Sequence, residues 1–414
     1  MTPFLFDVAF SSESLVVIAL IIIIGYISTA VFRRTRIPEL LILMLIGIFL
    51  VRIVNIVPAN YLDTLLAIAP VFGSLALVVI MFNGSKGLKF ESELVRNWKG
   101  LAFGILDIVL SVAIVSVLMR YAFGWPTIYG AILGAILGST STVVVIPFIR
   151  KVKINQDIFN SLFIETTVNS LVSIVVFSVL LVFINGQSFS AFSFTSYLLD
   201  YVSVAVVMGF LTGIGWIFII NNLKGAREYA ATLAMAILLY GMVGIFNGAS
   251  IIAVLIFGMI IGNEETIINA LNLDHFVKRV KNDSQQSIRD DAVDERPVEN
   301  ELEFLIRTFF FVFMGMIVVL SVQYLVYGII ITLLLVLARY VEVGILLGSN
   351  TPVERSLALS LTPKEVTVAT LATVVFGFGG FYFTQTFYIS FMVIVVTGIL
   401  SSFMLNRVKV EVKK

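Results

Sequence analysis

Long apolar stretches recur along the whole chain and alternate with short polar connections. Most of them are close to the ~20 residues that an α-helix needs to cross a lipid bilayer. The pattern therefore predicts an all-α polytopic membrane protein with about thirteen transmembrane helices. The expected spans are residues 13–32, 38–57, 63–82, 98–123, 127–148, 157–184, 194–221, 229–246, 248–262, 303–321, 324–347, 357–377 and 383–405.

Lysine and arginine gather in the connections that follow odd-numbered spans. Arg33, Arg34 and Arg36 follow the first span, and Arg150 and Lys151 follow the fifth. Connections after even-numbered spans are nearly free of both residue types. Because basic connections tend to stay in the cytoplasm, we expect an external N-terminus and a cytoplasmic C-terminus.

One connection, residues 263–302, holds the densest charge in the chain. It contains Asp290, Asp291, Asp294 and Glu295 among several bases, and it carries His275, the one histidine. This composition is typical of a solvated cytoplasmic loop, partly disordered, which is the interpretation that we favour. The alternative is a regulatory segment that senses pH or a partner.

The composition excludes several classes of protein. Hydrophobic residues make up 59% of the chain and charged residues 13%, which is not the balance of a soluble globular protein. A formal net charge of +1 gives no indication of nucleic-acid binding. With no cysteine and a single histidine, no metal-binding or nucleophilic constellation is visible. We therefore expect neither an enzyme nor a cofactor, and membrane lipid as a partner.

The sixth span contains a polar interruption. Glu165 and Asn169 are four residues apart, so on a helix they share one face, with Thr166 and Ser170 beside them. A carboxylate, an amide and hydroxyls at membrane depth are costly unless they face protein or water. This face is accordingly the first candidate for a functional site.

Two other spans are interrupted at corresponding places. The fifth contains Gly138-Ser139-Thr140-Ser141-Thr142, and the twelfth contains Pro363-Lys364-Glu365. Proline and clustered Ser/Thr side chains both compete with helix geometry. Paired breaks of this kind indicate a transporter with two inverted six-helix repeats and a central site where two discontinuous helices meet. The alternative is that the Ser/Thr cluster only packs helices together.

Further charged residues lie within the spans. Arg339 and Glu342 are three residues apart in the eleventh span, and Asp107 lies in the fourth. A buried Arg339 requires a carboxylate partner, and both Glu165 and Glu342 are candidates. Asp107 either carries a proton or pairs with another residue. Arg307, near a cytoplasmic end, is expected to snorkel to the surface.

The order of these motifs resembles the monovalent cation:proton antiporter superfamily, especially NhaP-type sodium/proton antiporters, over essentially the whole chain. The resemblance rests on Met81–Gly84, Gly138–Thr142, Glu165–Ser170, Arg339 and Pro363–Glu365. It implies the NhaA/NhaP-like fold and a homodimer in the plasma membrane of a prokaryote. It also implies elevator-like alternating access.

The resemblance assigns parts of the chain to separate roles. A mobile core domain would comprise the spans within 98–184 and 324–405, and a dimerisation domain those within 13–82 and 194–321. The ion site would be lined by Thr140, Ser141, Thr166, Asn169 and Ser170, and Glu165 with Arg339 would form a structural ion pair. Ser139, Thr142, Pro363 and Lys364 would form the crossing of the broken helices.

The chain departs from the family pattern at the ion-binding aspartates. Ser170 and Ser141 stand where aspartates are usual, and Asn83 replaces a third acidic residue. Serine and asparagine do not exchange a proton near neutral pH. Another carboxylate must therefore carry the proton; the candidates, in order, are Glu165 and Glu365, then Glu342 and Asp107.

These observations lead to one hypothesis and two alternatives. The hypothesis is a secondary active transporter that exchanges Na⁺ or K⁺ for protons. One alternative is a transporter of the same fold for an anion or a neutral solute, which the retained Lys364 and Arg339 would favour. The other is a non-exchanging sensor or channel-like relative whose exchange site has decayed.

Overall fold

The computed structural model describes residues 12–35, 38–53, 59–86, 97–141, 145, 149, 152, 154–185, 191–220, 227–270, 296–347, 350–364 and 366–408. Within these residues the chain forms fifteen α-helices and one short 3-10 helix. In chain order the α-helices are α1 (Ser12–Thr35), α2 (Glu39–Arg52), α3 (Ala59–Lys86), α5 (Trp98–Phe123), α6 (Thr127–Gly138), α8 (Gln156–Val182), α9 (Ala191–Ile220), α10 (Arg227–Ile245), α11 (Ser250–Gly262), α12 (Glu264–Ala270), α14 (Arg296–Ile317), α15 (Val322–Leu346), α16 (Pro352–Ser360), α17 (Val366–Phe376) and α18 (Phe381–Arg407). The 3-10 helix is Phe183–Asn185.

The helices confirm the predicted spans. Each of the thirteen apolar stretches contains a helix, and the twelfth contains two, α16 and α17, because the chain leaves helical geometry between Ser360 and Val366. Among the described residues, six helices are long and apolar enough to cross a membrane alone. The shorter apolar helices include α6 and α17, one from each broken span. The second half of the fifth span lies largely outside the described residues.

The stretch 263–302, which was predicted to be a charged loop, is helical at both of its ends. It begins with α12, which is bent by 79° from α11, and it ends in the first turns of α14. Residues 271–295, which include His275 and the aspartates, lie outside the described residues. The prediction of a solvated loop therefore stays a prediction for the residues between these helices.

Corresponding helices of the two halves of the chain contact each other through glycines. A Cβ atom at Gly47 of α2 would overlap the Val312 carbonyl oxygen of α14 and come within 2.8 Å of the Met316 nitrogen. A Cβ atom at Gly258 of α11 would lie 2.8 Å from the Phe82 carbonyl oxygen of α3. The second helix of each half thus touches the third helix of the other half. This arrangement fits the predicted inverted repeats.

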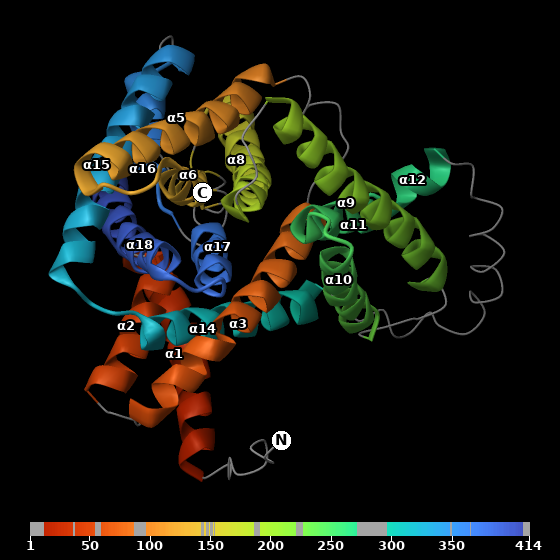
Figure 1. Cartoon of the computed structure of the whole chain (residues 1–414), viewed down its shortest axis with the longest axis horizontal. Coiled ribbons are helices and arrows are strands. Elements are labelled where there is room, and N and C mark those ends of the chain that lie inside the picture. Colours follow the sequence, from red (N-terminus) through yellow and green to blue (C-terminus); the bar gives the residue numbers. More distant parts are fainter. Residues whose placement is uncertain are drawn as a thin grey trace.

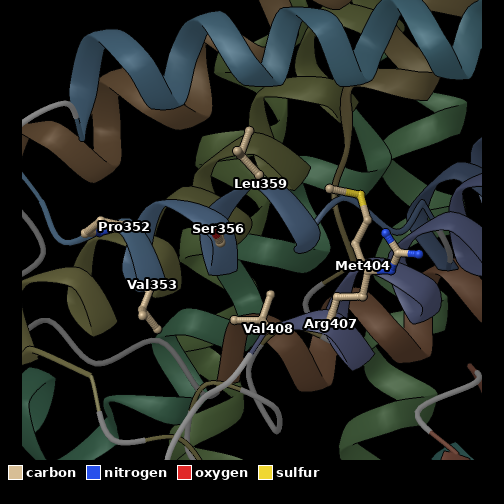
Figure 2. A pocket seen from close by; sticks show the side chains of 7 residues that line it. All are labelled: Pro352, Val353, Ser356, Leu359, Met404, Arg407 and Val408. Carbon is tan, nitrogen blue, oxygen red and sulfur yellow. The ribbon is translucent and has the colours of Figure 1, made fainter.

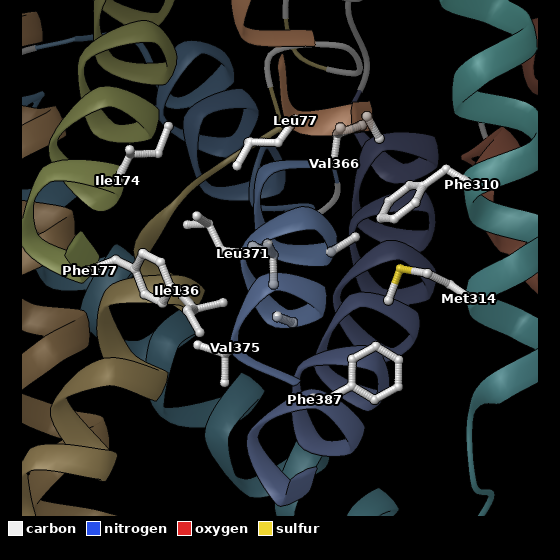
Figure 3. Close-up of a cluster of buried hydrophobic side chains, with 14 of the residues drawn as sticks. Leu77, Ile136, Ile174, Phe177, Phe310, Met314, Val366, Leu371, Val375 and Phe387 are labelled. Atoms are coloured by element: carbon white, nitrogen blue, oxygen red, sulfur yellow. The ribbon is translucent and has the colours of Figure 1, made fainter. Parts of the chain in front are cut away.

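Figure 1 shows how the helices are grouped. Helices α5, α6, α8 and α15–α18 gather on one side, and α9–α12 lie on the other, with α3 and α14 between them. Helix α17 lies in the middle of a continuous apolar core. Its Leu371 and Val375 lie among buried side chains from several other helices, including Leu77, Ile136 and Phe387 (Figure 3). Helix α17, the second helix of the twelfth span, is therefore enclosed by other helices.

Candidate functional site

Small residues bring α5, α6 and α8 into backbone contact. A Cβ atom at Gly134 of α6 would lie 2.7 Å from the Val112 Cα atom of α5. About two turns earlier on α5, a Cβ atom at Gly104 would lie 3.0 Å from the Glu165 carbonyl oxygen of α8. Helices that pack through glycine approach closely enough for short side chains to meet across the interface. This packing lets Asp107 of α5 reach both neighbouring helices.

The two breaks lie against each other and are joined by their backbones, at a place that we call the crossing because the broken helices are predicted to cross there. Helix α6 ends at Gly138, and Ser139 continues it in extended geometry, with φ −65° and ψ 137°. Beyond it the Ser141 amide donates a hydrogen bond of 2.9 Å to the Pro363 carbonyl of the second break. A helix end leaves carbonyl groups without partners in the helix. Those of α6 therefore face the crossing.

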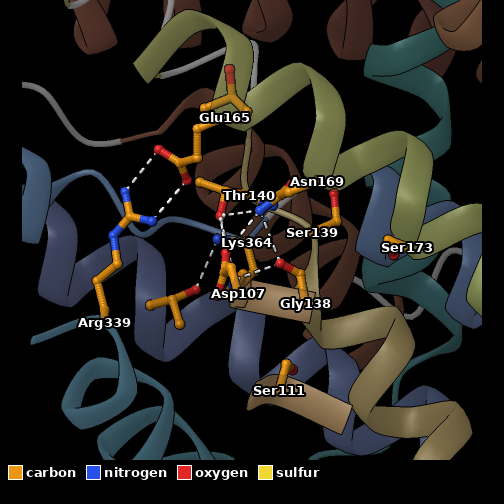
Figure 4. Close-up of polar contacts among 12 residues, drawn as sticks. Asp107, Ser111, Gly138, Ser139, Thr140, Glu165, Asn169, Ser173, Arg339 and Lys364 are labelled. Carbon is orange, nitrogen blue, oxygen red and sulfur yellow. Dashed lines mark hydrogen bonds and ion pairs between the residues drawn. The ribbon is translucent and has the colours of Figure 1, made fainter. Parts of the chain in front are cut away.

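Asp107 is the centre of a buried polar cluster at this crossing (Figure 4). Its Oδ2 atom accepts hydrogen bonds from Asn169 Nδ2, at 2.8 Å, and from Thr140 Oγ1, at 3.2 Å. The Lys364 ammonium lies 3.9 Å from the same oxygen. It also donates to the Gly138 carbonyl, at 3.2 Å, and to Thr140 Oγ1, at 3.4 Å. One carboxylate, one ammonium, one hydroxyl and one carbonyl from the end of α6 thus converge.

Asn169 fixes the geometry of this cluster. Its Nδ2 atom donates to the Gly138 carbonyl and to Thr140 Oγ1, both at 3.1 Å, in addition to Asp107. Its Oδ1 atom accepts from the Thr140 amide at 2.9 Å. The amide side chain of α8 therefore holds the unwound end of α6 in place.

The remaining predicted ion ligands lie beside the cluster. The hydroxyls of Ser139 and Ser170 are 3.0 Å apart, and Ser170 also bonds to the Thr166 carbonyl in its own helix. The Thr166 hydroxyl donates to the Phe163 carbonyl, again within α8. Ser141 is buried at the crossing through its backbone bond to Pro363. Two further predicted residues, Thr142 and Glu365, lie outside the described residues.

A second buried cluster surrounds Arg339. Its NH1 and NH2 atoms donate to the two carboxylate oxygens of Glu165, at 2.7 and 3.0 Å, and its Nε atom donates to the Ala358 carbonyl at 3.2 Å. The guanidinium carbon lies 4.1 Å from the centre of the Phe103 ring. Glu342, the rival partner, is 3.8 Å from NH1. The arginine thus connects α15 with α8, α16 and α5.

Other charged groups occupy separate places. Arg307, which was expected to snorkel, is half-buried and forms an ion pair with Glu39 at the start of α2. Asn83, at the third acidic position of the family, donates to Glu303 at 2.9 Å and accepts from the Tyr229 hydroxyl at 3.1 Å. None of these contacts involves the crossing.

Asp107, which the sequence placed with Glu342 after Glu165 and Glu365 as a proton carrier, is nevertheless the centre of the cluster. A signal was present: Gly100, Gly104, Asp107 and Ser111 recur at helical spacing and share one face of α5. A face made of small residues marks the side on which neighbouring helices approach. The contact of Lys364 with the first break was also missed, because it depends on how the two breaks cross.

A pocket of about 430 Å³ lies between α16 and the end of α18, away from this cluster (Figure 2). Its lining is mainly apolar and includes one charged side chain, Arg407. The lining residues are Pro352, Val353, Ser356, Leu359, Met404, Arg407 and Val408. The pocket therefore contains no residue of the candidate site.

Comparison with known proteins places these features in context. The family described as sodium/hydrogen exchanger, transmembrane, matches residues 16–410. The chain is 24% identical over 255 residues to the K(+)/H(+) antiporter NhaP2 of Shewanella sp. (strain MR-4), which covers 60% of this chain and 43% of that protein. It is 26% identical over 262 residues to the Probable Na(+)/H(+) antiporter 2 of Methanocaldococcus jannaschii, covering 58% of each. Each match thus spans less than two thirds of the relative.

A solved structure shares the fold. The structure of the sodium proton antiporter MjNhaP1 from Methanocaldococcus jannaschii at pH 8 superposes with a TM-score of 0.72 at 21% sequence identity. The superposition covers 96% of this chain and 98% of that chain. This similarity confirms the predicted polytopic, all-helical antiporter fold.

Proposed function

Because the chain belongs to the family of transmembrane sodium/hydrogen exchangers, we propose that it exchanges Na⁺ or K⁺ for protons across the plasma membrane of a prokaryote. The observation that carries this proposal is the position of Asp107 at the crossing of the two broken helices. The relatives are named for K⁺ in one case and Na⁺ in another, so both cations belong to the proposal.

The contacts of the Lys364 ammonium outline a cation site. The ammonium is close to three oxygens, those of Gly138, Thr140 and Asp107, at 3.2, 3.4 and 3.9 Å. Carbonyls freed by broken helices, together with nearby side-chain oxygens, are the ligands that transporters use for Na⁺. In our proposal the substrate cation displaces the ammonium from these oxygens, and Asp107 supplies the negative charge.

A charge count supports exchange rather than simple binding. Six charged residues are buried in the described part of the chain: Asp107, Glu165, Arg339, Glu342, Glu354 and Lys364. Glu354 caps α16, and the other five surround the crossing. With all five ionised, carboxylates exceed cations by one, and an uncompensated buried charge is costly. Either one proton or one monovalent cation restores neutrality, so entry of one favours departure of the other.

The helix grouping supports a moving core. In our proposal α5, α6, α8 and α15–α18 move together during alternating access, and the remaining helices form a fixed domain that dimerises. The Arg339–Glu165 pair would hold this core together, since it joins helices from both halves of the chain. The N-terminus would be external and the C-terminus cytoplasmic, as the charges of the connections predict.

The structure offers little support for the alternative of anion transport. Lys364 and Arg339 are the cations that would attract an anion, and each lies beside a carboxylate. Such pairing leaves no excess of positive charge at the crossing. A non-exchanging relative remains an outcome of the experiment below.

A proteoliposome assay tests the proposal. An imposed pH gradient is monitored with a pH-sensitive dye, and NaCl or KCl is then added. We expect the wild-type protein to dissipate the gradient and Asp107→Asn to lose at least about tenfold in rate, equivalent to about 1.4 kcal/mol. Asp200→Asn is the matched control, because Asp200 is an exposed aspartate on α9. Dissipation by neither cation, or full activity of Asp107→Asn, would overturn the proposal.

A further inference from the structure

Glu342 differs from the other carboxylates of the buried cluster. It lies on α15 one turn after Arg339, and its exposed fraction is 0%. Neither of its carboxyl oxygens accepts a hydrogen bond within the described part of the chain. The NH1 atom of Arg339 is 3.8 Å from Oε2, which is beyond hydrogen-bond distance.

The contacts of the three carboxylates indicate where the balancing proton resides. Asp107 accepts hydrogen bonds from Asn169 and Thr140, and Glu165 accepts two from Arg339. Both are therefore surrounded by donors, as ionised carboxylates require. An ionised, fully buried Glu342 without a donor would be far more costly than its neutral acid. In this conformation the proton that balances the cluster belongs on Glu342.

We propose that Glu342 is the proton-exchanging group of this transporter, separate from the cation site at Asp107. This inference rests on the proposed function. When a monovalent cation displaces Lys364 and binds at Asp107, the O–H bond of Glu342 breaks and its proton passes to water. One positive charge enters the buried cluster and one leaves, so its total charge is unchanged. Return of the proton to Glu342 drives the cation out.

Arg339 is placed to accommodate the ionised form of Glu342. A guanidinium carries five N–H groups, and three of them are used in the bonds to Glu165 and Ala358. NH1 has a second hydrogen, and a small shift of either side chain closes the 3.8 Å separation to a hydrogen bond. Proton release thus converts an isolated carboxyl into a third member of the arginine cluster.

The charged groups around Glu342 come from several helices. Those that act on it are Arg339 on its own helix, Asp107 on α5, Glu165 on α8 and Lys364 in the second break. The other two helices that pack against α15 also carry titratable residues. These are Glu354 and Arg355 on α16, and Tyr382, Tyr388 and Arg407 on α18. Because Asp107 belongs to the first group, the positive charge of a cation bound there favours the ionised form of Glu342.

Proton release on cation binding is the direct test. Purified full-length protein in detergent, weakly buffered and containing a pH indicator, is titrated with NaCl or KCl near neutral pH. We expect the wild-type protein to release about one proton for each cation bound. Glu342→Gln, which keeps the shape of the neutral acid, should still bind the cation but lose this release. Glu354→Gln is the matched control, a buried glutamate in a helix cap, and should release protons as the wild type does.

Two further variants separate Glu342 from its neighbours. Lys364→Arg keeps a permanent positive charge at the crossing that does not lose a proton, so a proton released for each cation that this variant binds must come from another group. Loss of release in Lys364→Arg, with full release in Glu342→Gln, would assign the proton to Lys364 and overturn the inference. If Glu342→Gln fails to fold, Glu342→Asp replaces it. Glu342→Asp should release the proton with a shifted pH dependence, and an unshifted profile would count against Glu342.

The same measurements distinguish this inference from the proposed function. A wild-type protein that binds neither Na⁺ nor K⁺ would refute the proposed exchange itself. A wild-type protein that exchanges, with proton release intact in Glu342→Gln, would refute only the role of Glu342. Exchange by the wild type together with proton-independent cation binding in Glu342→Gln supports both.

Discussion

Replacing Glu165 and Glu342 by glutamine, singly and together, should reveal that the two carboxylates share Arg339. Glu165 is the present partner, with two hydrogen bonds of 2.7 and 3.0 Å, whereas Glu342 is 3.8 Å from NH1. Removing one member of a buried ion pair usually costs about 3–5 kcal/mol, because the other charge remains without a partner. In Glu165→Gln, however, Glu342 can ionise and bind the guanidinium in its place.

The magnitude follows from this geometry. Two unit charges 4 Å apart attract by about 4 kcal/mol at the effective dielectric constant of a protein, so a substitute partner recovers much of the loss. We expect Glu165→Gln to cost about 1–2 kcal/mol and the double variant to cost the full 3–5 kcal/mol. Glu342→Gln alone should cost less than about 1 kcal/mol, since glutamine resembles the neutral acid. The coupling energy between the two sites would then be about 1–3 kcal/mol.

Equilibrium unfolding in detergent at neutral pH measures the free energies of unfolding of the wild type, the two single variants and the double variant. The midpoint and slope of each denaturant transition give the free energy of unfolding by linear extrapolation. A control cycle pairs Glu165→Gln with Glu303→Gln, because Glu303 bonds to Asn83 in a different part of the molecule. That control should be additive within about 0.5 kcal/mol. If the cycle of Glu165 and Glu342 is equally additive, Glu342 does not replace Glu165 as the partner of Arg339.

Two further predictions concern stability. Gly47→Ala should destabilise the protein by about 1–3 kcal/mol, because the new methyl group overlaps the Val312 carbonyl. Gly241→Ala, with no atom within 4 Å of the added methyl, should be neutral or stabilising in the same thermal unfolding assay. Burial acts to raise the pKa of Glu354 at the N-terminus of α16, but hydrogen bonds from Thr351 outweigh it and hold the pKa below its ordinary value. The stability from this cap is therefore present above the ordinary pKa of a glutamate and is lost as pH falls through the lowered one. Glu354→Gln should remove the part of the stability that is lost in acid. An acid unfolding curve identical to that of the wild type would contradict this role of the cap.

The helix positions were largely predictable because local signals mark them. The predicted fourth span, 98–123, has the same bounds as α5. Its start is capped by the side chain of Asn97, and its end by Gly124 in left-handed geometry, with φ 69°. The break at Pro363 was equally visible, because proline disfavours helix at the residue before it. Signals of this kind act over a few residues and need no knowledge of the fold.

Partners across helices were less predictable, for a physical reason. Arg339 needed a carboxylate wherever it was buried, and that requirement left two candidates in the sequence. The choice between Glu165 and Glu342 depended on how α8 and α15 pack. For the same reason the ion pair of Arg307 with Glu39 was not predicted, because it depends on how α2 packs against α14. Charge compensation predicts that a partner exists, and the packing of glycine faces decides which residue it is.

Our proposal explains the missing aspartates of the family pattern by distance and charge rather than by sequence position. A cation site at the crossing needs one carboxylate within reach of the freed carbonyl of Gly138, and the glycine face of α5 lets Asp107 serve there. In our proposal, proton coupling needs one more buried carboxylate than the two buried cations of the described residues can neutralise, and Glu342 supplies it. In our proposal these two residues together take over what one aspartate at the position of Ser170 would do. If so, a change at either one should separate cation binding from proton release, which a single shared site does not permit.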